Sequence, residues 1–441
     1  MNNKKINKES IKVLFTLLNV ILYLFLFIFV LTNFYEYVNY RLYGYVIIGF
    51  IYLIIFVIFG EFCEIFKLGE TTVKDLLLSY SLAIFITNFF IYFINCLICL
   101  RMISVLPLSI LQVVDCVLIA FILFSENKYI RDNYPVPKAI AIIGKNSDSI
   151  LNKIYKYRDI LVTVDKKVSV NKITERSLIK LLNDYEKVIT IDVDHEQKKL
   201  IFKECYKRHI QVLDIPSITD MLIASSNIMN VIDAPVLSVN KFGPSIIESF
   251  VKRTIDIVGS LFLIVLTSPI MLLVSLAIKI NDGGDIIFKQ KRLTKDERVF
   301  EIYKFRSMVM NAELLTGAVL AKENDTRITK VGRFIRKTRF DELPQLFNIL
   351  KGDMTFVGPR PERPEIYNNI IKEFPEFKYR LVVKAGLTGY AQIYGKYNTT
   401  MKDKLLLDLY YIENYKLLDD IKLLVQTLKI IFNKESTEGI K

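Results

Sequence analysis

Residues 325–364 read DTRITKVGRFIRKTRFDELPQLFNILKGDMTFVGPRPERP, and this stretch decides the organisation of the chain. Its first half is rich in lysine and arginine, and an acidic pair, Asp341 and Glu342, follows directly. Two more arginines, Arg360 and Arg363, stand in a proline-rich loop at its end. Cationic side chains gathered around two carboxylates are typical of a site that binds an anion.

The same stretch predicts two helices. Basic residues recur at every third position from Arg327 to Arg336 with apolar residues between them, which predicts a helix with one basic and one apolar face. Such a helix suits a membrane surface or a polyphosphate. Asp341 then stands where the N-cap of a second helix is expected, with Pro344 in its first turn and Gly352 just beyond its end.

Two interpretations of Asp341 stay open at this point. It can cap the second helix, or it can act as a nucleophile, because a helix N-terminus would also hold a phosphoryl group attached to it. Successive helical residues project about 100° apart, so Asp341 and Glu342 cannot flank one bond as a glycosidase pair does. They need separate roles. One carboxylate can attack phosphorus while the other holds a divalent cation, for which Mg²⁺ is expected.

Three ordered motifs resemble a known family. They are KFRSM at 304–308, DELPQLFNILKGDMTFVGPRP from Asp341, and GLTGYAQIYGK at 386–396. Together they resemble the bacterial sugar transferases, the monotopic phosphoglycosyl transferases, over about residues 250–433. The resemblance implies that Asp341 forms a phosphoryl-aspartate intermediate and that Glu342 helps to hold Mg²⁺.

The resemblance also assigns the cationic residues and shows one departure. It implies that Arg336 and Arg360 bind phosphate, and it favours a structural or substrate-phosphate role for Lys304 and Arg306 in the KFRSM motif. After Gly389 the chain carries tyrosines and a lysine where tryptophan, asparagine and arginine are often found in the family. The transferred sugar therefore stays open between glucose, galactose and an N-acetylated amino sugar. The departing residues are Tyr390, Tyr394 and Lys396.

Composition indicates a membrane protein. Of the 441 residues 52% are hydrophobic, and the formal net charge is +13. Such a charge fits nucleic acid or an anionic lipid surface, and the long apolar segments favour the lipid. No aromatic-interleaved basic platform or known reader motif is present in the sequence, so no nucleic-acid partner is expected. Four of the five cysteines lie in or beside apolar segments, which predicts neither disulfides nor a zinc site.

Residues 1–130 are predicted to form four transmembrane helices. The apolar stretches lie at about 13–31, 42–60, 76–99 and 102–124, each near the roughly 20 residues that a spanning helix needs. Lysine and arginine are concentrated before the first, between the second and third, and after the fourth, which places both ends on the cytoplasmic side. Asp115, inside the fourth stretch, is expected to face a neighbouring helix or water.

Residues 138–240 are predicted to form a Rossmann-like α/β domain. Its short apolar runs, read as strands, lie at 139–144, 159–164, 187–192 and 210–215. After the first run Gly144 matches the first glycine of the dinucleotide fingerprint, but Asn146 and Ser149 replace the other two. Although Asp165 stands at the ribose-binding spacing, this pattern favours a regulatory or dimerising domain. Larger members of the resembled family carry such a domain here, and a homodimer is expected.

Residues 257–278 are long enough to span a bilayer, but they predict a re-entrant hairpin. Ser268 and Pro269 stand at the midpoint, where proline should bend the helix. Basic residues flank both ends, which places both on the cytoplasmic side. The family resemblance implies the same hairpin, at about 255–280. It would hold the catalytic segment at the level of lipid headgroups.

The rest of the C-terminal domain is predicted to be α+β. Two short strands are expected at 286–290 and 300–305, and 402–433 forms an amphipathic helical stretch that docks on the membrane or on the catalytic core. Residues 434–441 form a polar tail. The fold class is thus a membrane α region, an α/β domain and an α+β catalytic domain over 250–433.

The resemblance implies a specific reaction. The protein is expected to transfer a hexose-1-phosphate from a UDP-sugar to undecaprenyl or another polyprenyl phosphate, with release of UMP, at the cytoplasmic face of a bacterial plasma membrane. This would initiate exopolysaccharide, capsule or related glycan synthesis. The alternative is a catalytically silent membrane regulator that senses nucleotides through its α/β domain.

Overall fold

The computed structural model describes most of the chain as two compact units. The units comprise Met1–Pro216 and Ser217–Lys441, and each is considered by itself. The described residues are 8–35, 42–144, 150–151, 154, 162–224, 226–231, 233–239, 243–309, 325, 327–395 and 399–431. The polar tail at 434–441, Asn146, Ser149 and Lys396 lie outside them.

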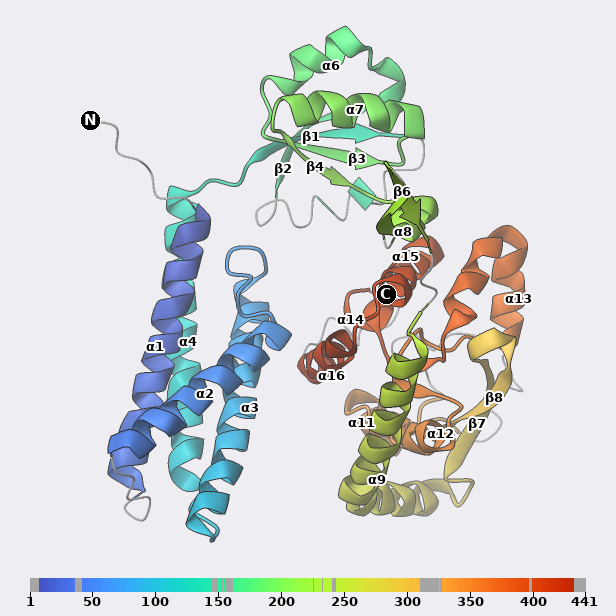
Figure 1. Ribbon diagram of the computed structural model, residues 1–441. Helices are drawn as coiled ribbons and strands as arrows, with labels where there is room; N and C mark the ends of the chain where they lie inside the picture. Colours follow the sequence, from blue (N-terminus) through green and yellow to red (C-terminus); the bar gives the residue numbers. More distant parts are fainter. Residues whose placement is uncertain are drawn as a thin grey trace. The chain divides into compact units, whose positions relative to one another are not determined.

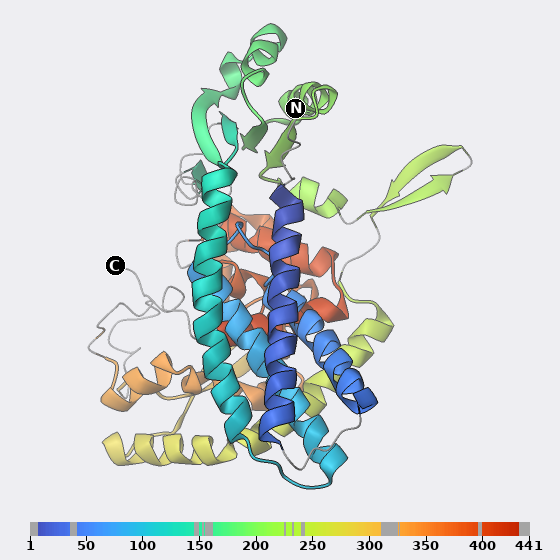
Figure 2. The ribbon, with the colours of Figure 1, turned by 90° about the vertical axis from the view of Figure 1, so that its left-hand side faces the viewer.

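The first unit begins with long apolar helices. They are α1 (Lys8–Phe34), α2 (Leu42–Cys63), α3 (Val73–Cys99) and α4 (Leu106–Asn133), and each contains most of one predicted apolar stretch. Figures 1 and 2 show α1 and α4 side by side. Aromatic rings fill the space between helices, as where Phe27 stacks on Tyr52 with ring centroids 4.4 Å apart. Asp115 is fully buried, as its position in an apolar helix predicts.

The α/β domain of the first unit is built on a parallel sheet. Its strands are β1 (Lys138–Ile143), β2 (Thr163–Ser169), β3 (Lys187–Ile191) and β4 (Gln211–Asp214), in the order β2-β1-β3-β4. The short helix η1 (Val170–Lys172) and helices α6 (Glu175–Leu182) and α7 (His195–Lys207) connect them (Figure 1). The predicted α/β class is confirmed, because β1 and β3 are buried and carry core side chains of both sheet faces.

The second strand differs from its prediction. The apolar run at 159–164 overlaps β2 at its last two residues, and 159–161 lie outside the described residues. β2 is an edge strand with an exposed polar centre, so a search for apolar runs misses most of it. Asp165 lies inside β2, where it accepts a hydrogen bond from the Tyr185 hydroxyl at 2.9 Å, and not at the carboxyl end where a ribose would bind.

The second unit contains the long helix α9 and a compact domain behind it. In chain order its elements are α8 (Ile218–Ala224), β5 (Asn227–Val231), β6 (Ala234–Ser238), α9 (Ile246–Asp282), β7 (Ile287–Leu293), η2 (Lys295–Glu297), β8 (Val299–Phe305), α11 (Lys330–Lys337), η3 (Phe340–Glu342), α12 (Gln345–Lys351), β9 (Thr355–Val357), α13 (Pro364–Glu373), η4 (Pro375–Val382), β10 (Gly386–Thr388), α14 (Tyr390–Ile393), α15 (Met401–Glu413) and α16 (Leu417–Ile431). The antiparallel pair β7–β8 confirms the two strands predicted after α9.

The predicted C-terminal amphipathic stretch is two helices, α15 and α16. The chain leaves the helix at Asn414 and re-enters it at Leu417. Their apolar side chains join the core around α12 and β9, which includes Ile349, Phe356 and Ile412. Of the two docking surfaces predicted for this stretch, the catalytic core is therefore the one that the structure shows.

Helix α9 bends but remains a helix through its proline. Figures 1 and 2 both show α9 changing direction sharply part-way along. Pro269 lacks the N–H that would bond to the carbonyl of Val265, four residues earlier. The hydroxyl of Ser268 donates to that carbonyl at 2.8 Å instead. Serine therefore replaces the donor that proline removes, which matters most where water is scarce.

Replacing the proline is expected to straighten α9. A straight helix from Ile247 to Ile280 would be about 50 Å long, and both side chains are exposed and suited to spin labels. In protein whose five native cysteines are replaced, labels at these positions should lie well under 50 Å apart. Pro269→Ala should lengthen the distance measured by double electron–electron resonance, because the backbone N–H returns and the ring clash disappears.

The matched control is Ser268→Ala. It removes the hydroxyl bonded to Val265 but keeps the ring of Pro269, so the label distance should stay that of the parent. An unchanged distance in Pro269→Ala would show that packing, and not the proline, imposes the bend.

Candidate active site

Helix α11 carries Arg336, one of the cationic residues predicted for the site. Its N-terminus is capped by Thr329, whose hydroxyl accepts from the Gly332 N–H at 2.8 Å. Gly332 lies so close to the end of β8 that a Cβ atom there would be 1.9 Å from the Ser307 carbonyl oxygen. This close approach fixes the first turn of α11 beside the end of the strand that carries Lys304, and Arg336 lies in the last turn of the same short helix.

The acidic pair lies in a tight turn and does not cap a helix. Asp341 and Glu342 belong to the 3₁₀ turn η3, and α12 begins at Gln345. The prediction of Asp341 as N-cap is therefore wrong. An N-cap side chain bonds to the N–H two or three residues on. Pro344 has no N–H, and Leu343 donates its own to the Phe340 carbonyl. The predicted end of the helix is confirmed, since Gly352 is its C-cap with φ +94°.

Backbone strain precedes the pair. Arg339 has φ +61° and ψ +15°, a left-handed conformation that costs a non-glycine residue on the order of 1–2 kcal/mol. The sequence offered no sign of this, because a glycine or asparagine would be expected there. This turn sets the direction in which the following carboxylates project, and Arg339 adds a positive charge near both.

Glu342 is held by two cations from different elements. The ammonium of Lys304 on β8 lies 2.8 Å from Glu342 Oε1, and Arg360 Nη2 lies 3.3 Å from the same oxygen. Burial alone would raise the pKa of Glu342, but Lys304 and Arg360 outweigh it and hold that pKa well below its usual range. Glu342 is therefore a permanent anion under physiological conditions.

Asp341 has the opposite environment. Its Oδ1 atom is buried and has no hydrogen-bond partner in the part of the chain that the structure describes. Burial, and then the negative charge of Glu342, raise the pKa of Asp341 above its ordinary value, although Lys304, Arg339 and Arg336 oppose the rise. A carboxylate with an uncommitted oxygen and a raised pKa is a better nucleophile than an ordinary aspartate.

The loop that carries Arg360 is held in place by its backbone. Four consecutive carbonyls of the loop each accept one hydrogen bond, and the donors belong to β10, η4 and β7. The pairs are Pro359 O with Gly386 N at 2.9 Å, Arg360 O with Arg380 Nη2 at 3.0 Å, Pro361 O with Arg292 Nη1 at 3.0 Å and Glu362 O with Leu293 N at 3.0 Å. With its prolines, this loop holds Arg360 in one place before any substrate arrives.

Arg380 is a supporting residue that the sequence did not reveal. Its side chain is 2% exposed and forms an ion pair with Asp408, which is 1% exposed, at 2.8 Å. The same guanidinium donates to the carbonyl of Arg360. Nothing in the sequence separates Arg380 from the other basic residues around it, since its burial arises from contacts distant along the chain.

The remaining predicted site residues are placed as follows. Arg306 directly follows β8, and its side chain is 9% exposed, so it is a buried residue and not a surface cation. The rings of Tyr390 and Tyr394 pack with centroids 5.0 Å apart. Ser268 and Pro269 lie inside α9. Lys304 and Arg360 are thus the predicted cations that the structure brings onto the acidic pair.

The acidic pair fits a magnesium ion that is shared with a substrate. No group of three or more histidine, cysteine, aspartate or glutamate side chains that could hold a metal occurs among the described residues. Mg²⁺, however, is often bound by one or two carboxylates together with substrate phosphates. The unpartnered oxygen of Asp341 beside the ionised Glu342 offers such a donor set.

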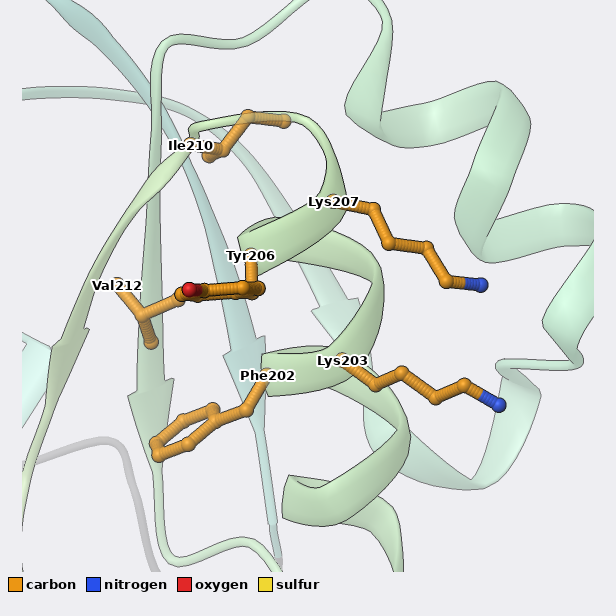
Figure 3. Close-up of a pocket in the computed structure, with 6 residues that line it drawn as sticks. All are labelled: Phe202, Lys203, Tyr206, Lys207, Ile210 and Val212. Carbon is orange, nitrogen blue, oxygen red and sulfur yellow. The ribbon is translucent and has the colours of Figure 1, made fainter.

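A hollow in the α/β domain has a different character. Figure 3 shows the rings of Phe202 and Tyr206 on α7 on the same side as Val212 of β4, while Lys203 and Lys207 extend away from them. Apart from these two lysines its lining is apolar or aromatic, and it includes no carboxylate or histidine. The hollow therefore offers no carboxylate nucleophile of the kind found at Asp341.

Asp341→Asn is expected to stabilise the native state at neutral pH. A carboxyl group whose pKa is raised by folding disfavours the native state once pH exceeds its ordinary value. The thermal unfolding midpoint in detergent should therefore be higher in the variant at pH 7, and the difference should vanish as pH falls below the ordinary pKa of aspartate. Asp285→Asn, which removes an exposed carboxylate of the same unit, is the control. A lower midpoint for Asp341→Asn at pH 7 would contradict the burial argument.

Comparison with known proteins finds matches over the part of the chain that contains this site. The family model described as bacterial sugar transferase matches residues 247–434. An N-acetylgalactosamine phosphotransferase acting on undecaprenyl phosphate, from Aeromonas hydrophila, is 40% identical over 233 residues, which are 52% of this chain and 53% of that protein. An undecaprenyl-phosphate galactose phosphotransferase of Salmonella typhimurium is 38% identical over 42% of this chain and 41% of its own.

A third relative is named for UDP-glucose. The UDP-glucose:undecaprenyl-phosphate glucose-1-phosphate transferase of Escherichia coli is 36% identical over 49% of this chain and 48% of its own. The chain thus spans about half the length of the curated relatives that it matches. All the site residues from Lys304 to Asp408 fall inside the matched region. The C-terminal part of the chain, residues 247–434, therefore matches the bacterial sugar transferase family.

Proposed function

We propose that this protein transfers a hexose-1-phosphate from a UDP-sugar to undecaprenyl phosphate and releases UMP. The observation that carries the proposal is the unequal state of the two adjacent carboxylates. Glu342 is neutralised by Lys304 and Arg360, whereas Asp341 keeps a buried oxygen without a partner among the described residues. The names of the relatives support the substrate classes, since they act on undecaprenyl phosphate with different hexoses.

The first half-reaction forms a covalent intermediate in this proposal. The carboxylate oxygen of Asp341 attacks the β-phosphorus of the UDP-sugar, and the bond from that phosphorus to the bridging oxygen breaks. UMP leaves with the electron pair of that bond. The sugar-1-phosphoryl group is then joined to Asp341 as a mixed anhydride, and no proton transfer is needed.

The second half-reaction regenerates the enzyme. A phosphate oxygen of the lipid attacks the phosphorus of the phosphoryl-aspartate, and the carboxylate of Asp341 departs. Arg360 and Arg336 hold the phosphate oxygens and offset the repulsion between two anions that must meet. When bound at Glu342 and the diphosphate, Mg²⁺ would add positive charge where charge develops on the leaving phosphate.

Helix α9 supports a placement at the membrane surface. Only 11% of its most apolar window is buried within the structure, against 28–33% for the four N-terminal helices. Its bent course and its internal Ser268–Pro269 pair suit a helix that enters one leaflet and returns. This re-entrant arrangement, with the catalytic domain on the cytoplasmic face and the protein as a homodimer, is part of the proposal.

The reaction predicts UMP release that depends on Asp341. The purified full-length protein in detergent, with undecaprenyl phosphate and Mg²⁺, is expected to release UMP from one of UDP-glucose, UDP-galactose or UDP-N-acetylgalactosamine. Asp341→Asn should lower the rate by about 10⁴-fold or more, as expected for loss of a nucleophile. Trapping with a UDP-sugar labelled in its β-phosphate should place label on the parent protein and none on the variant.

The control is Asp285→Asn, which should keep the parent rate. Substantial turnover in Asp341→Asn would remove Asp341 as the nucleophile. Absence of UMP release from every donor, with all lipid and metal conditions tested, would favour the silent regulator instead.

The electrostatics predict how the pH profile responds to Lys304. Asp341 must be ionised to attack, so the rate of UMP release should fall as pH drops through its raised pKa. Lys304 lowers the pKa of both carboxylates. Lys304→Met should therefore move the acid limb of the kcat/KM profile to higher pH, in addition to slowing the reaction. Lys289→Met removes an exposed lysine of the neighbouring strand and should leave the limb in place; an equal shift in both variants would indicate a general charge effect.

A further inference from the structure

A cavity with charged side chains in its wall lies in the C-terminal unit, near the C-terminal end of helix α12. It has a volume of about 200 Å³ and is lined by side chains from α9, η2 and the segment before β10. Four of its lining residues are cations and one is a carboxylate. They are Lys252, Arg253, Lys295, Lys384 and Asp256.

This cavity is separate from the acidic pair. The guanidinium of Arg253 donates to the carbonyls of Ile349 and Leu350, both at 2.7 Å, at the C-terminal end of α12. Asp341 and Glu342 precede the N-terminal end of the same helix. Seven residues of α-helix, about 10 Å, thus stand between the two sites, and the cavity is not an extension of the reaction centre.

Positive charge exceeds negative charge in the cavity. Lys252 forms an ion pair with Asp420, and Asp256 offers one further carboxylate. That carboxylate already accepts from the Thr355 hydroxyl and from the Phe356 N–H, both at 3.0 Å. Two carboxylates therefore face four cations, and two positive charges have no counterpart. Arg298 and Asp353 also lie near Lys384. They form an ion pair with one another at 3.2 Å, so together they add no net charge.

The two cations of the cavity without a direct partner in the described part of the chain are Lys295, which is exposed, and Lys384, whose charge Asp256 and Asp353 offset only in part. Neither ammonium has an ion pair or hydrogen bond with any residue that the structure describes. Lys384 is half-buried, and burial followed by the nearby charge of Arg253 lowers its pKa. Burying an ammonium beside a guanidinium is costly unless an anion compensates the pair. An anion in the cavity would therefore offset positive charge at Lys384 and Arg253 beyond what Asp256 supplies.

We infer that this cavity binds a phosphate group, held by Lys384 and Lys295 against Arg253. A volume of 200 Å³ admits a phosphate monoester or diester with its first substituent atoms. The charged side chains of its wall are four cations and one carboxylate, and ammonium and guanidinium nitrogens match phosphate oxygens. The group can belong to a lipid headgroup or to a free phosphate, and the experiment distinguishes these sources. The inference does not depend on the proposed transfer reaction.

Lysine footprinting tests the inference at the level of single residues. The full-length protein in detergent is acetylated briefly with an N-hydroxysuccinimide ester at increasing inorganic phosphate, at constant ionic strength kept with chloride. Mass spectrometry then gives the acetylated fraction of each lysine. Phosphate is expected to protect Lys384 and Lys295, and not Lys372, an exposed lysine on α13. Phosphate bound at the acidic pair does not confuse this readout, because each lysine is measured separately.

Two variants make the test specific. Lys295→Gln should raise the phosphate concentration that half-protects Lys384 by about tenfold, the loss expected for one charge-assisted hydrogen bond. Lys372→Gln removes the same charge elsewhere and should not change it. Because Lys295 is exposed, its substitution is not expected to disturb folding.

A lipid arm identifies the source of the phosphate. Protection of Lys384 in nanodiscs of phosphatidylglycerol, beyond that in phosphatidylcholine, would assign the site to an anionic headgroup. Equal labelling in both lipids, with protection by inorganic phosphate, would assign it to a free phosphate. The inference is wrong if neither inorganic phosphate nor phosphatidylglycerol protects Lys384 from acetylation. It is also wrong if phosphate protects Lys384 at the same concentration in the parent and in Lys295→Gln. UMP release is measured on the same samples, so loss of the reaction and loss of this site are told apart.

Discussion

The architecture of the site depends on the ion pairs that Glu342 makes with Lys304 and Arg360. They join three elements distant in sequence, a strand, a tight turn and a proline-rich loop, at one carboxylate oxygen. By neutralising Glu342 they leave Asp341 as the carboxylate whose charge is not matched by a direct partner among the described residues. Neighbours in sequence thus become chemically different because the surrounding chain compensates one and buries the other.

Other contacts of the domain hold in place the loop and the helix that surround these two carboxylates. The loop of Arg360 has four consecutive carbonyls in hydrogen bonds, and the close approach of Gly332 to Ser307 holds α11 against β8. The buried pair of Arg380 and Asp408 stabilises the same loop from the far side. Such support restricts the positions of cations before any substrate binds, which reduces the cost of ordering them later.

Much of this organisation could be predicted from the sequence, and the reasons for the failures are physical. Apolar stretches locate the N-terminal helices and α9, since length and hydropathy are local properties. Strand β2 was mostly missed, because an edge strand with a polar centre lacks the apolar run of a buried one. The end of α12 was correct, since a glycine C-cap is a local signal, but its start was wrong, because Pro344 removes the N–H that an N-cap needs.

In the site, residue types were predictable but their pairing was not. The motifs single out Asp341, Glu342 and the cations around them. Which cation contacts which carboxylate depends on contacts between elements, and so the ion pair of Lys304 with Glu342 appears only in the structure. The left-handed conformation of Arg339 and the burial of Arg380 likewise have no signal in the neighbouring sequence.

The depressed pKa of Glu342 also limits which kinds of catalysis are open to the site. A carboxyl group that stays ionised far below neutral pH carries no proton to give, so Glu342 is excluded as a general acid towards a departing nucleotide. A leaving phosphate would then be stabilised by fixed positive charge and not by a proton from Glu342. The two cations that bind Glu342 thus favour a site that works by electrostatic complementarity over one that works by proton transfer.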